Sequence, residues 1–367
     1  MIPFANITVI GVGLIGGSLS LAFKRKIPGI TVTGVDRREV LDEALEAGVI
    51  DAAVPAGETP AAVRSADLIF LCTPIGEILR LIPEIAGEVG PGAVVTDVGS
   101  TKRLIVETAD RFFEGDRFFI GGHPMAGGEG RGIRWADAFL FENAVYVFTP
   151  SRPLPSDVVK ALGNTIEKIG AKILFLSPSM HDRVAAAVSH LPQMLAVTLM
   201  NMVAGHQEDS PFFLKLAAGG FRDMTRIASS PYDMWESIIE TNRQEILAFM
   251  DEFIACLERM KRRLTDGELK KQFQESARHR LSIPKDTKGF LKPHHDLLVR
   301  VEDRPGVIAS ISGTLAGEGI NIKDIEILKV REGDAGTLRL SFESPEARHR
   351  ARASIEKIGF SSRLTGQ

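Results

Sequence analysis

The sequence predicts an α/β protein in three parts: a doubly wound parallel sheet, an all-helical domain and a small ferredoxin-like (βαββαβ) domain. Three observations lead to this prediction. A buried strand runs into a glycine-rich turn near the N-terminus, apolar strands alternate with helical segments up to residue 176, and strand patterns return only beyond residue 294. We expect domains at 1–176, 177–281 and 295–367, with a polar linker at 282–294.

The first strand, at 7–10, leads into a Gly-x-Gly-x-x-Gly turn and a helix. In such a turn Gly11 permits the tight bend, Gly13 lets a pyrophosphate approach the backbone, and Gly16 lets the helix pack closely on the strand. The helix N-terminus offers N–H donors to phosphate. Asp36 ends the next strand about 20 residues beyond Gly16, where a carboxylate binds ribose hydroxyls. This Rossmann-type pattern predicts a dinucleotide site that prefers NAD.

Further apolar strands are expected at 67–72, 93–97, 117–121, 144–149 and 171–176. Short, fully apolar strands separated by helix-length segments indicate a parallel sheet covered on both faces. Ligands of such sheets bind beyond the carboxyl ends of the strands, and three polar motifs fall there. The residues expected to contact the cofactor are Gly11, Gly13, Leu14, Ile15, Gly16, Asp36, Thr73 and Pro74.

The other two strand-end motifs contain Ser100, in the segment 97–102, and His123, in the glycine-rich segment 121–129. Both side chains are expected to face one crevice although they lie far apart in the chain. The competing interpretation for a lone Ser or His is a helix cap or a loop residue. Glycines on both sides of His123, beside a dinucleotide site, favour a catalytic role.

The helical domain carries two histidines nine residues apart, His181 and His190. Nine residues exceed whole helical turns by about half a turn, so we expect the two rings to point to opposite faces. Gln193 shares a face with His190, and one of the two faces would look into the cleft. The alternative for either histidine is a core position.

A second motif of the helical domain follows the paired glycines Gly219 and Gly220. Arg222 and Arg226 lie four residues apart on one helix face, with Asp223 between them. Two guanidinium groups near a helix start attract carboxylates, because each forked guanidinium can donate two hydrogen bonds to one carboxylate and the N-terminal end of the helix dipole is positive. The alternative is a solvated cluster of Arg and Asp.

Bulk composition argues against some functions. The net charge of −3, the 7% aromatic content and the mixed charges of 259–280 favour neither nucleic acid nor a membrane surface as partner. We find no secretion signal and no apolar stretch long enough to span a bilayer, so a cytoplasmic location is expected. Cys72 and Cys256 are far apart in apolar runs, which predicts reduced core thiols rather than a disulfide or metal site.

The last domain follows the order strand, helix, strand, strand, helix and strand, with its second strand expected from residue 320. The turn 303–306 and Gly319-Ile-Asn321 resemble the ACT domain, an amino-acid-sensing module. That resemblance implies an effector site at Asp303, Gly306 and Asn321, at an interface between two such domains. The alternative is an ordinary turn and strand start in a domain that only oligomerises.

Taken together, five motifs in this order resemble the prephenate dehydrogenase family, from Ile7 to about Arg280. They are Asp-Val-Gly-Ser-Thr-Lys, Gly-Gly-His-Pro-Met-Ala-Gly, His-Asp, Ser-His-Leu-Pro and Gly-Gly-Phe-Arg-Asp-Met-Thr-Arg-Ile. The resemblance implies that His123 is the catalytic histidine, that Ser100 is its hydroxyl partner and that Arg226 clamps a substrate carboxylate. It also implies that Glu129 is a gating carboxylate.

The residues that would bind substrate are Arg226, Arg222, Asp223, Glu129, Gly219, His190 and Gln193. Arg222 and Asp223 would lie near the mouth of the site, which they could reach from a second subunit. The chain departs from the family pattern Ser-His-Leu-Pro-His at Gln193, where a neutral amide replaces a titratable group. That departure puts in doubt any proton or ion-pair role at this position.

The resemblance implies NAD-dependent oxidative decarboxylation of prephenate to 4-hydroxyphenylpyruvate in tyrosine biosynthesis. It further implies feedback by tyrosine, a homodimer formed through the helical domain and no metal. The alternatives are an arogenate dehydrogenase, a non-enzymatic sensor of dinucleotide and amino acid, and another hydroxy-acid dehydrogenase. The His-Pro-Met-Ala-Gly loop argues against the last of these, because that family usually has a catalytic lysine on its helical domain and no such loop.

Overall fold

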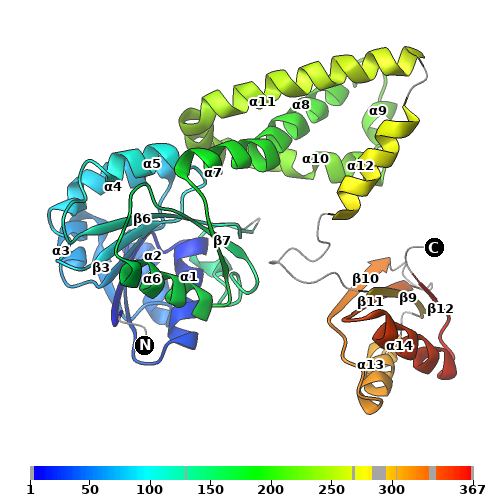
Figure 1. Ribbon diagram of the computed structural model, residues 1–367, viewed down its shortest axis with the longest axis horizontal. Helices are drawn as coiled ribbons and strands as arrows, with labels where there is room; N and C mark the ends of the chain where they lie inside the picture. Colours follow the sequence, from blue (N-terminus) through cyan, green and yellow to red (C-terminus); the bar gives the residue numbers. More distant parts are fainter. Residues whose placement is uncertain are drawn as a thin grey trace. The chain divides into compact units, whose positions relative to one another are not determined.

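The computed structural model describes residues 4–128, 130–266, 269–282, 295–302, 304–329 and 336–364. The chain divides into two compact units, residues 1–275 and 276–367 (Figure 1). The nucleotide-binding and helical segments therefore belong to one unit. The linker expected at 282–294 lies, apart from its first residue, outside the described residues.

The first unit is built on a sheet with the strand order β3-β2-β1-β4-β5-β6-β7-β8. Its strands are β1 (Asn6–Ile10), β2 (Thr31–Asp36), β3 (Ala52–Pro55), β4 (Leu68–Leu71), β5 (Val94–Asp97), β6 (Phe118–Pro124), β7 (Val145–Thr149) and β8 (Lys172–Phe175). Neighbouring strands pair in parallel except β6 and β7, which are antiparallel. A parallel β7 was expected, but the described residues between β6 and β7 hold only a 3₁₀ turn, η2 (Ile133–Trp135), and no crossover helix.

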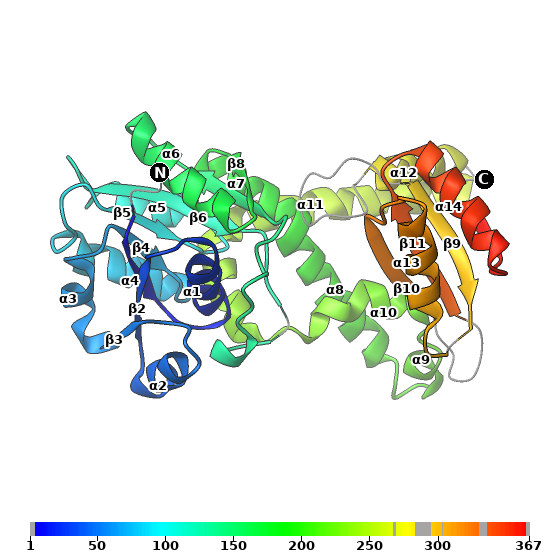
Figure 2. The same ribbon diagram turned by 90° about the horizontal axis from the view of Figure 1, so that it is seen from below.

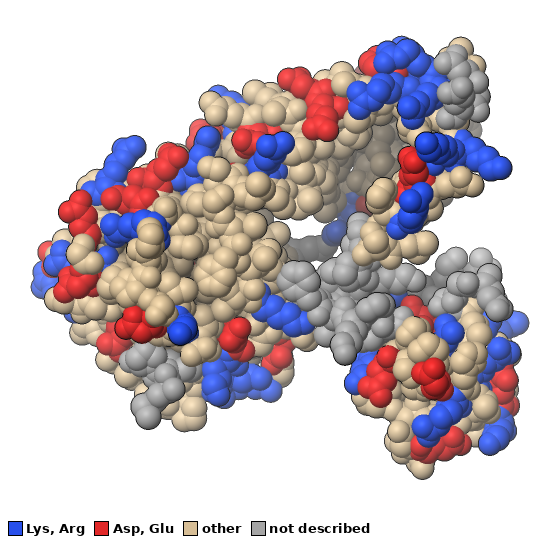
Figure 3. Space-filling model, in the orientation of Figure 1, with Lys and Arg blue, Asp and Glu red and all other residues tan. Residues whose placement is uncertain are grey.

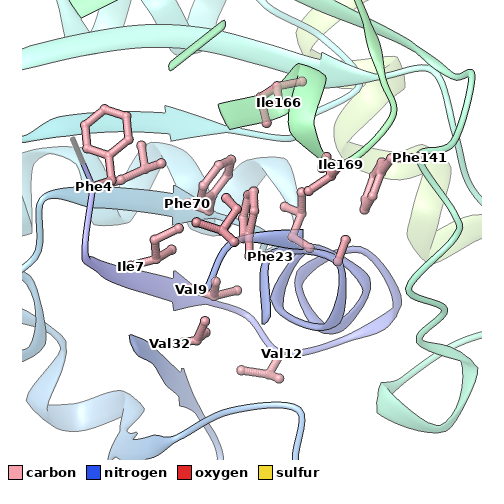
Figure 4. Packing of buried hydrophobic residues seen from close by; sticks show 14 of the residues in the cluster. Phe4, Ile7, Val9, Val12, Phe23, Val32, Phe70, Phe141, Ile166 and Ile169 are labelled. Carbon is pink, nitrogen blue, oxygen red and sulfur yellow. The ribbon is translucent and has the colours of Figure 1, made fainter. Parts of the chain in front are cut away.

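Helices cover both faces of this sheet. They are α1 (Leu14–Lys26), α2 (Arg38–Glu46), α3 (Thr59–Val63), α4 (Ile75–Ala86), α5 (Arg103–Ala109) and α6 (Ser156–Lys168), with the 3₁₀ turn η1 (Ala56–Glu58). Successive strand residues point to opposite faces, so Val9 joins the cluster of α1 and α6 whereas Ile10 joins that of α3 to α5. Figure 4 shows Phe23 of α1 against Phe70 of β4, with ring centroids 5.3 Å apart. Burial on both faces holds the carboxyl ends of the strands in place.

The helical part of the first unit starts at Ser177, whose hydroxyl accepts a hydrogen bond from Met180 N at 3.2 Å, as expected for a helix cap. Its elements are α7 (Pro178–Ala185), the π-helical turn η3 (Ala186–His190), α8 (Leu191–Gly205), α9 (Phe212–Lys215), α10 (Gly219–Thr225), the 3₁₀ turn η4 (Arg226–Ser229), α11 (Tyr232–Asp266) and the first half of α12 (Lys270–Ser282), a helix that crosses the boundary between the two units. Asn242 interrupts α11 with non-helical backbone angles. Lys and Arg side chains gather where α11 ends (Figure 3).

One helix in the described part of the chain, Pro178–Gly205, is long and apolar enough to cross a membrane, judged by length and composition alone. The expectation that no stretch reaches this length is therefore wrong. The helix carries four polar side chains that are buried inside the protein, His181, Asp182, His190 and Gln193. Polar groups buried against protein are typical of a helix that packs in a folded domain.

The second unit contains an antiparallel sheet with the order β10-β11-β9-β12. Its elements are β9 (His295–Val301), α13 (Val307–Gly317), β10 (Asp324–Lys329), β11 (Gly336–Phe342), α14 (Pro345–Lys357) and β12 (Ser362–Leu364). Both helices cover one face of this sheet (Figure 2), with Leu297, Ile311 and Leu340 in the shared core. The predicted fold class is confirmed for all three parts, although β10 begins four residues later than expected.

Candidate active site

The glycine turn after β1 forms the first wall of the site. Gly11 has φ +94°, and a Cβ there would lie 2.8 Å from the backbone of Cys72. A Cβ on Gly16 would lie 2.0 Å from the carbonyl oxygen of Gly11. At Gly13, in contrast, no heavy atom lies within 4 Å of a Cβ position. The turn is therefore closed on its protein side and open where α1 begins.

Asp36 lies at the carboxyl end of β2, next to this turn. Its Oδ2 accepts a hydrogen bond from Val12 N at 2.8 Å, and its Oδ1 accepts one from Arg37 N at 2.7 Å. These two backbone donors fix the carboxylate beside the glycine turn. The side chain of Arg37 is 80% exposed, and its Nε lies 3.9 Å from Asp36 Oδ1.

A pocket of about 560 Å³ lies beyond the carboxyl ends of β1, β4, β5 and β6. Seven of the expected residues line it: Gly13, Leu14, Ile15, Thr73, Pro74, Ser100 and His123. The helical part closes it with side chains from α11 that the sequence did not single out, Asp233, Met234 and Ser237. Thr73 Oγ1 is buried in this wall and has no hydrogen-bond partner within the described residues.

His123 lies inside β6, not in a loop after it, and its ring is held from the helical part. His123 Nδ1 lies 2.8 Å from His181 Nε2, and His181 Nδ1 lies 2.8 Å from Asp182 Oδ1. Ser100 lines the same pocket. The contact between His123 and His181 could not be expected from local sequence, because the two residues belong to a strand and a helix far apart in the chain.

A buried ion pair supports the strand ends behind His123. Lys102 Nζ contacts Asp97 Oδ2 and donates to Gly122 O at 2.7 Å, and both charged side chains are fully buried. The Asp97 carboxylate also accepts hydrogen bonds from Gly99 N at 2.8 Å and Gly122 N at 3.1 Å. The pair thereby connects the end of β5 to the residue before His123.

The surroundings of His123 favour a neutral imidazole. Burial is the largest cause of a pKa held well below the usual 6.5, and electrostatic interactions with His181, Lys102 and His190 act in the same direction. Burial also lowers the pKa of Lys102, although Asp97 opposes this shift. A neutral ring at pH 7 can accept a proton.

His181 and His190 are both buried, and the π-helical turn Ala186–His190 departs from the ideal spacing on which the expectation of opposite faces rests. His181 contacts His123 of β6, whereas the ring of His190 lies against Trp235 of α11, with ring centroids 5.9 Å apart. Asn242 Nδ2 donates to Asp182 O at 2.8 Å and lies 3.2 Å from His190 Nδ1. Burial lowers the pKa of His190 to about 4.

Gln193 is 2% exposed, and its Oε1 is one of the buried side-chain atoms without a hydrogen-bond partner in the described structure. Asn242 Oδ1, from α11, is another. Unpaired buried polar atoms are costly unless water or a ligand satisfies them. Neither residue lines the pocket as the single chain forms it.

The expected carboxylate-binding motif lies apart from the pocket of the single chain. Gly219, Arg222 and Asp223 belong to α10, whereas Arg226 begins the following 3₁₀ turn, and all four are exposed. Arg222 and Arg226 were expected on one α-helical face, but the α-helix ends at Thr225. None of the four appears among the described residues that line the pocket.

Two expected residues, Glu129 and Asp303, lie outside the described residues. Gly306 has φ +88° and precedes α13, and Asn321 is exposed in the segment before β10. Cys72 lies at the pocket, but Cys256 is exposed on α11, so the prediction of a core thiol is wrong there. The described residues contain no group of three or more His, Cys, Asp or Glu side chains that could hold a metal ion.

A doubly wound sheet with an open glycine turn, and a pocket that joins this turn to a buried imidazole, define a dinucleotide-dependent dehydrogenase. Family comparison gives the particular family. The nucleotide-binding domain of prephenate dehydrogenase matches residues 19–175, its dimerization domain matches 177–277, and the ACT domain matches 295–353. The chain belongs to the prephenate dehydrogenase family.

Three similar proteins illustrate this match. Prephenate dehydrogenase of Bacillus subtilis is 38% identical over 96% of this chain and 95% of its own length. The crystal structure of Aquifex aeolicus prephenate dehydrogenase with hydroxyphenyl propionate and NAD⁺ covers 76% of this chain and 98% of its own, with 27% identity and a TM-score of 0.70. Synechocystis arogenate dehydrogenase covers 75% of this chain and 98% of its own, with 32% identity and a TM-score of 0.67. The predicted family and an oxidoreductase activity are thus confirmed.

Proposed function

We propose that the chain catalyses the NAD-dependent oxidation of prephenate, with loss of carbon dioxide, to 4-hydroxyphenylpyruvate, a step of tyrosine biosynthesis. The observation that carries this proposal is the single pocket that joins the helix N-terminus of the glycine turn to Ser100 and His123. Similarity to the B. subtilis enzyme over nearly the full length supports it. We also propose a cytoplasmic location, which cell fractionation can check.

The residues of the pocket fit NAD. The open space at Gly13 admits a pyrophosphate, the N-terminus of α1 supplies N–H donors, and Asp36 offers a carboxylate to ribose hydroxyls. The unpaired Thr73 Oγ1 provides a hydroxyl in the pocket wall. When bound, NAD accepts the hydride that the substrate carbon loses.

His123 accepts the proton of the substrate hydroxyl in this proposal, and Ser100 directs that hydroxyl. A neutral ring is required for the first role, and the lowered pKa of His123 supplies it. Arg226 binds a substrate carboxylate through a charge-assisted hydrogen bond. Glu129 gates the site, while Gly219, His190 and Gln193 complete the substrate contacts.

We propose that Arg226, together with Arg222 and Asp223, reaches the pocket within a homodimer. The match to a dimerization domain at 177–277 supports this assembly. Large apolar side chains of the same region are exposed, among them Met202, Phe212, Leu216 and Met224. Exposed apolar patches of this kind mark protein interfaces. Sedimentation of the purified protein checks the dimer.

We propose that tyrosine inhibits the enzyme by binding near Asp303, Gly306 and Asn321, between two ACT domains. Gly306 has a left-handed backbone with no heavy atom within 4 Å of a Cβ position at the start of α13, and Asn321 is exposed; both observations support this location. Truncation after Arg280 is expected to leave an active enzyme that tyrosine inhibits much less. Unchanged inhibition of an active truncated enzyme would instead assign tyrosine to the active site.

The experiment that tests the main proposal is a comparison of prephenate and arogenate as substrates. NADH absorbance and carbon dioxide release are measured with each, and a higher kcat/KM is expected with prephenate. A higher kcat/KM with arogenate would favour the alternative that the similarity to the Synechocystis enzyme suggests. Absence of turnover with both would favour a non-enzymatic sensor.

A further inference from the structure

Two buried side chains stand behind His123 in a continuous line of hydrogen bonds. His181 and Asp182 follow each other on α7 and are only 3% and 1% exposed. His181 Nε2 lies 2.8 Å from His123 Nδ1, and His181 Nδ1 lies 2.8 Å from Asp182 Oδ1. The line therefore begins at the pocket and ends at a carboxylate inside the protein.

The Asp182 carboxylate is held as an acceptor. Its Oδ1 accepts a hydrogen bond from Lys102 N at 2.6 Å, and its Oδ2 accepts one from Arg103 N at 2.9 Å. These two N–H groups belong to the N-cap residue and the first residue of α5, where the helix dipole also favours a negative charge. A carboxylate in this setting can only accept from His181, so the proton between them belongs to His181 Nδ1.

The position of that proton fixes the tautomers further along the line. A neutral His181 with a proton on Nδ1 has a lone pair on Nε2, which accepts a hydrogen bond from His123 Nδ1–H. His123 then has its own lone pair on Nε2.

We propose that His181 and Asp182 are positioning residues that keep His123 in the Nδ1–H tautomer, with Nε2 available to take the substrate's hydroxyl proton. This inference rests on the proposed role of His123 as the base. The proton moves from the substrate oxygen to His123 Nε2 and makes the ring an imidazolium. The Nδ1 proton stays on His123, and neither His181 nor Asp182 gains or loses one.

Asp182 has a second effect, because its two hydrogen bonds to the start of α5 join the helical part to the nucleotide-binding part close to Ser100. The charged or titratable groups that act on His123 are His181 on α7, Lys102 before α5 and His190 in the π-helical turn. Asp97 lies beyond Lys102 as its ion-pair partner.

Substitutions at His181 separate a positioning role from a structural one. In His181→Gln the amide oxygen can take the place of Nε2 as acceptor, whereas His181→Leu removes the acceptor. We expect kcat for prephenate to fall at least about 10²-fold in His181→Leu and less than about 10-fold in His181→Gln, with both KM values within about 3-fold of the wild type. Asp182→Asn should also act on kcat, by up to about 10⁴-fold, since an amide allows the wrong tautomer.

Thr241→Val is the matched control. Thr241 Oγ1 lies 2.8 Å from Thr101 Oγ1, so this variant also removes a hydrogen bond between α11 and the start of α5, but Thr241 makes no described hydrogen bond to a histidine. We expect a kcat within about 2-fold of the wild type. An equal loss of kcat in Thr241→Val and His181→Leu would contradict the proposal, because the effect would then belong to the interface.

Long-range ¹H–¹⁵N correlation spectra of the histidine-labelled wild-type protein give a second test that needs no active variant. The proposal predicts that neutral His123 carries its proton on Nδ1, and a proton on Nε2 would overturn it.

Kinetics of two variants distinguish a failure of this inference from a failure of the proposed function. If His123→Asn is inactive while His181→Leu keeps its kcat, only the positioning role is lost, whereas an active His123→Asn removes the base itself.

Discussion

Replacing Lys102 by Met should destabilise the first unit strongly. The substitution keeps most of the side-chain length but removes the ammonium that contacts Asp97 and donates to Gly122 O. Asp97 is fully buried and would be left with only two backbone donors, Gly99 N and Gly122 N. Removing one partner of a buried ion pair costs about 3–5 kcal/mol, so we expect a loss of that size in the free energy of unfolding.

Lys24 provides a matched surface control. It makes the same pair of contacts, to Asp51 Oδ1 at 2.6 Å and to Gly48 O at 2.9 Å, but its side chain is 27% exposed. Lys24→Met should therefore cost only about 0–1 kcal/mol. Urea unfolding followed by tryptophan fluorescence measures both variants, because Trp135 and Trp235 both belong to the first unit. Equal losses in the two variants would refute the reasoning from burial.

Three further predictions concern cofactor, substrate and pH. Asp36→Ser should lower kcat/KM with NAD and raise it with NADP, since the carboxylate that repels a 2′-phosphate is gone. An unchanged preference would mean that other residues, such as Arg37, determine the choice between NAD and NADP. Arg226→Ala should raise KM for prephenate with little change in kcat, because the lost hydrogen bond to the carboxylate stabilises the bound substrate and the transition state equally. A fall in kcat with an unchanged KM in steady-state kinetics would contradict this role. The free energy of unfolding should fall by about 3 kcal/mol as pH drops from 6.5 to 4, because unfolded His190 takes a proton near pH 6.5 but the folded state only near pH 4. Urea titrations across that range check this fall, which His190→Gln should reduce.

Several features of the fold follow directly from the sequence. The strand β2 occupies the expected range Thr31–Asp36, and the glycine turn leads into a helix as its spacing predicts. In contrast, the edge strand β3 (Ala52–Pro55) was not expected, because it is short, only partly buried and ends in proline. Local periodicity identifies long buried elements better than short edges.

The candidate site could be predicted only in part. Motifs identified His123 and Ser100, and parallel strand ends bring both to one pocket. The contact of His123 with His181 could not be predicted, because only the folded chain brings β6 and α7 together. The position of Arg226 relative to the pocket could not be predicted from local sequence either, because Arg226 does not line the pocket that a single chain forms.

The central claim is that His123 is the base in an NAD-dependent oxidation of prephenate, and steady-state kinetics of His123→Asn test it most directly. NAD binding, measured by titration calorimetry, should stay within about 3-fold of the wild type, while kcat with prephenate should fall about 10²- to 10⁴-fold. In the wild type, kcat/KM should decline only below pH 6.5, because burial lowers the pKa of His123 and the base stays unprotonated above that value. A wild-type kcat in His123→Asn, with NAD still bound, would contradict the account.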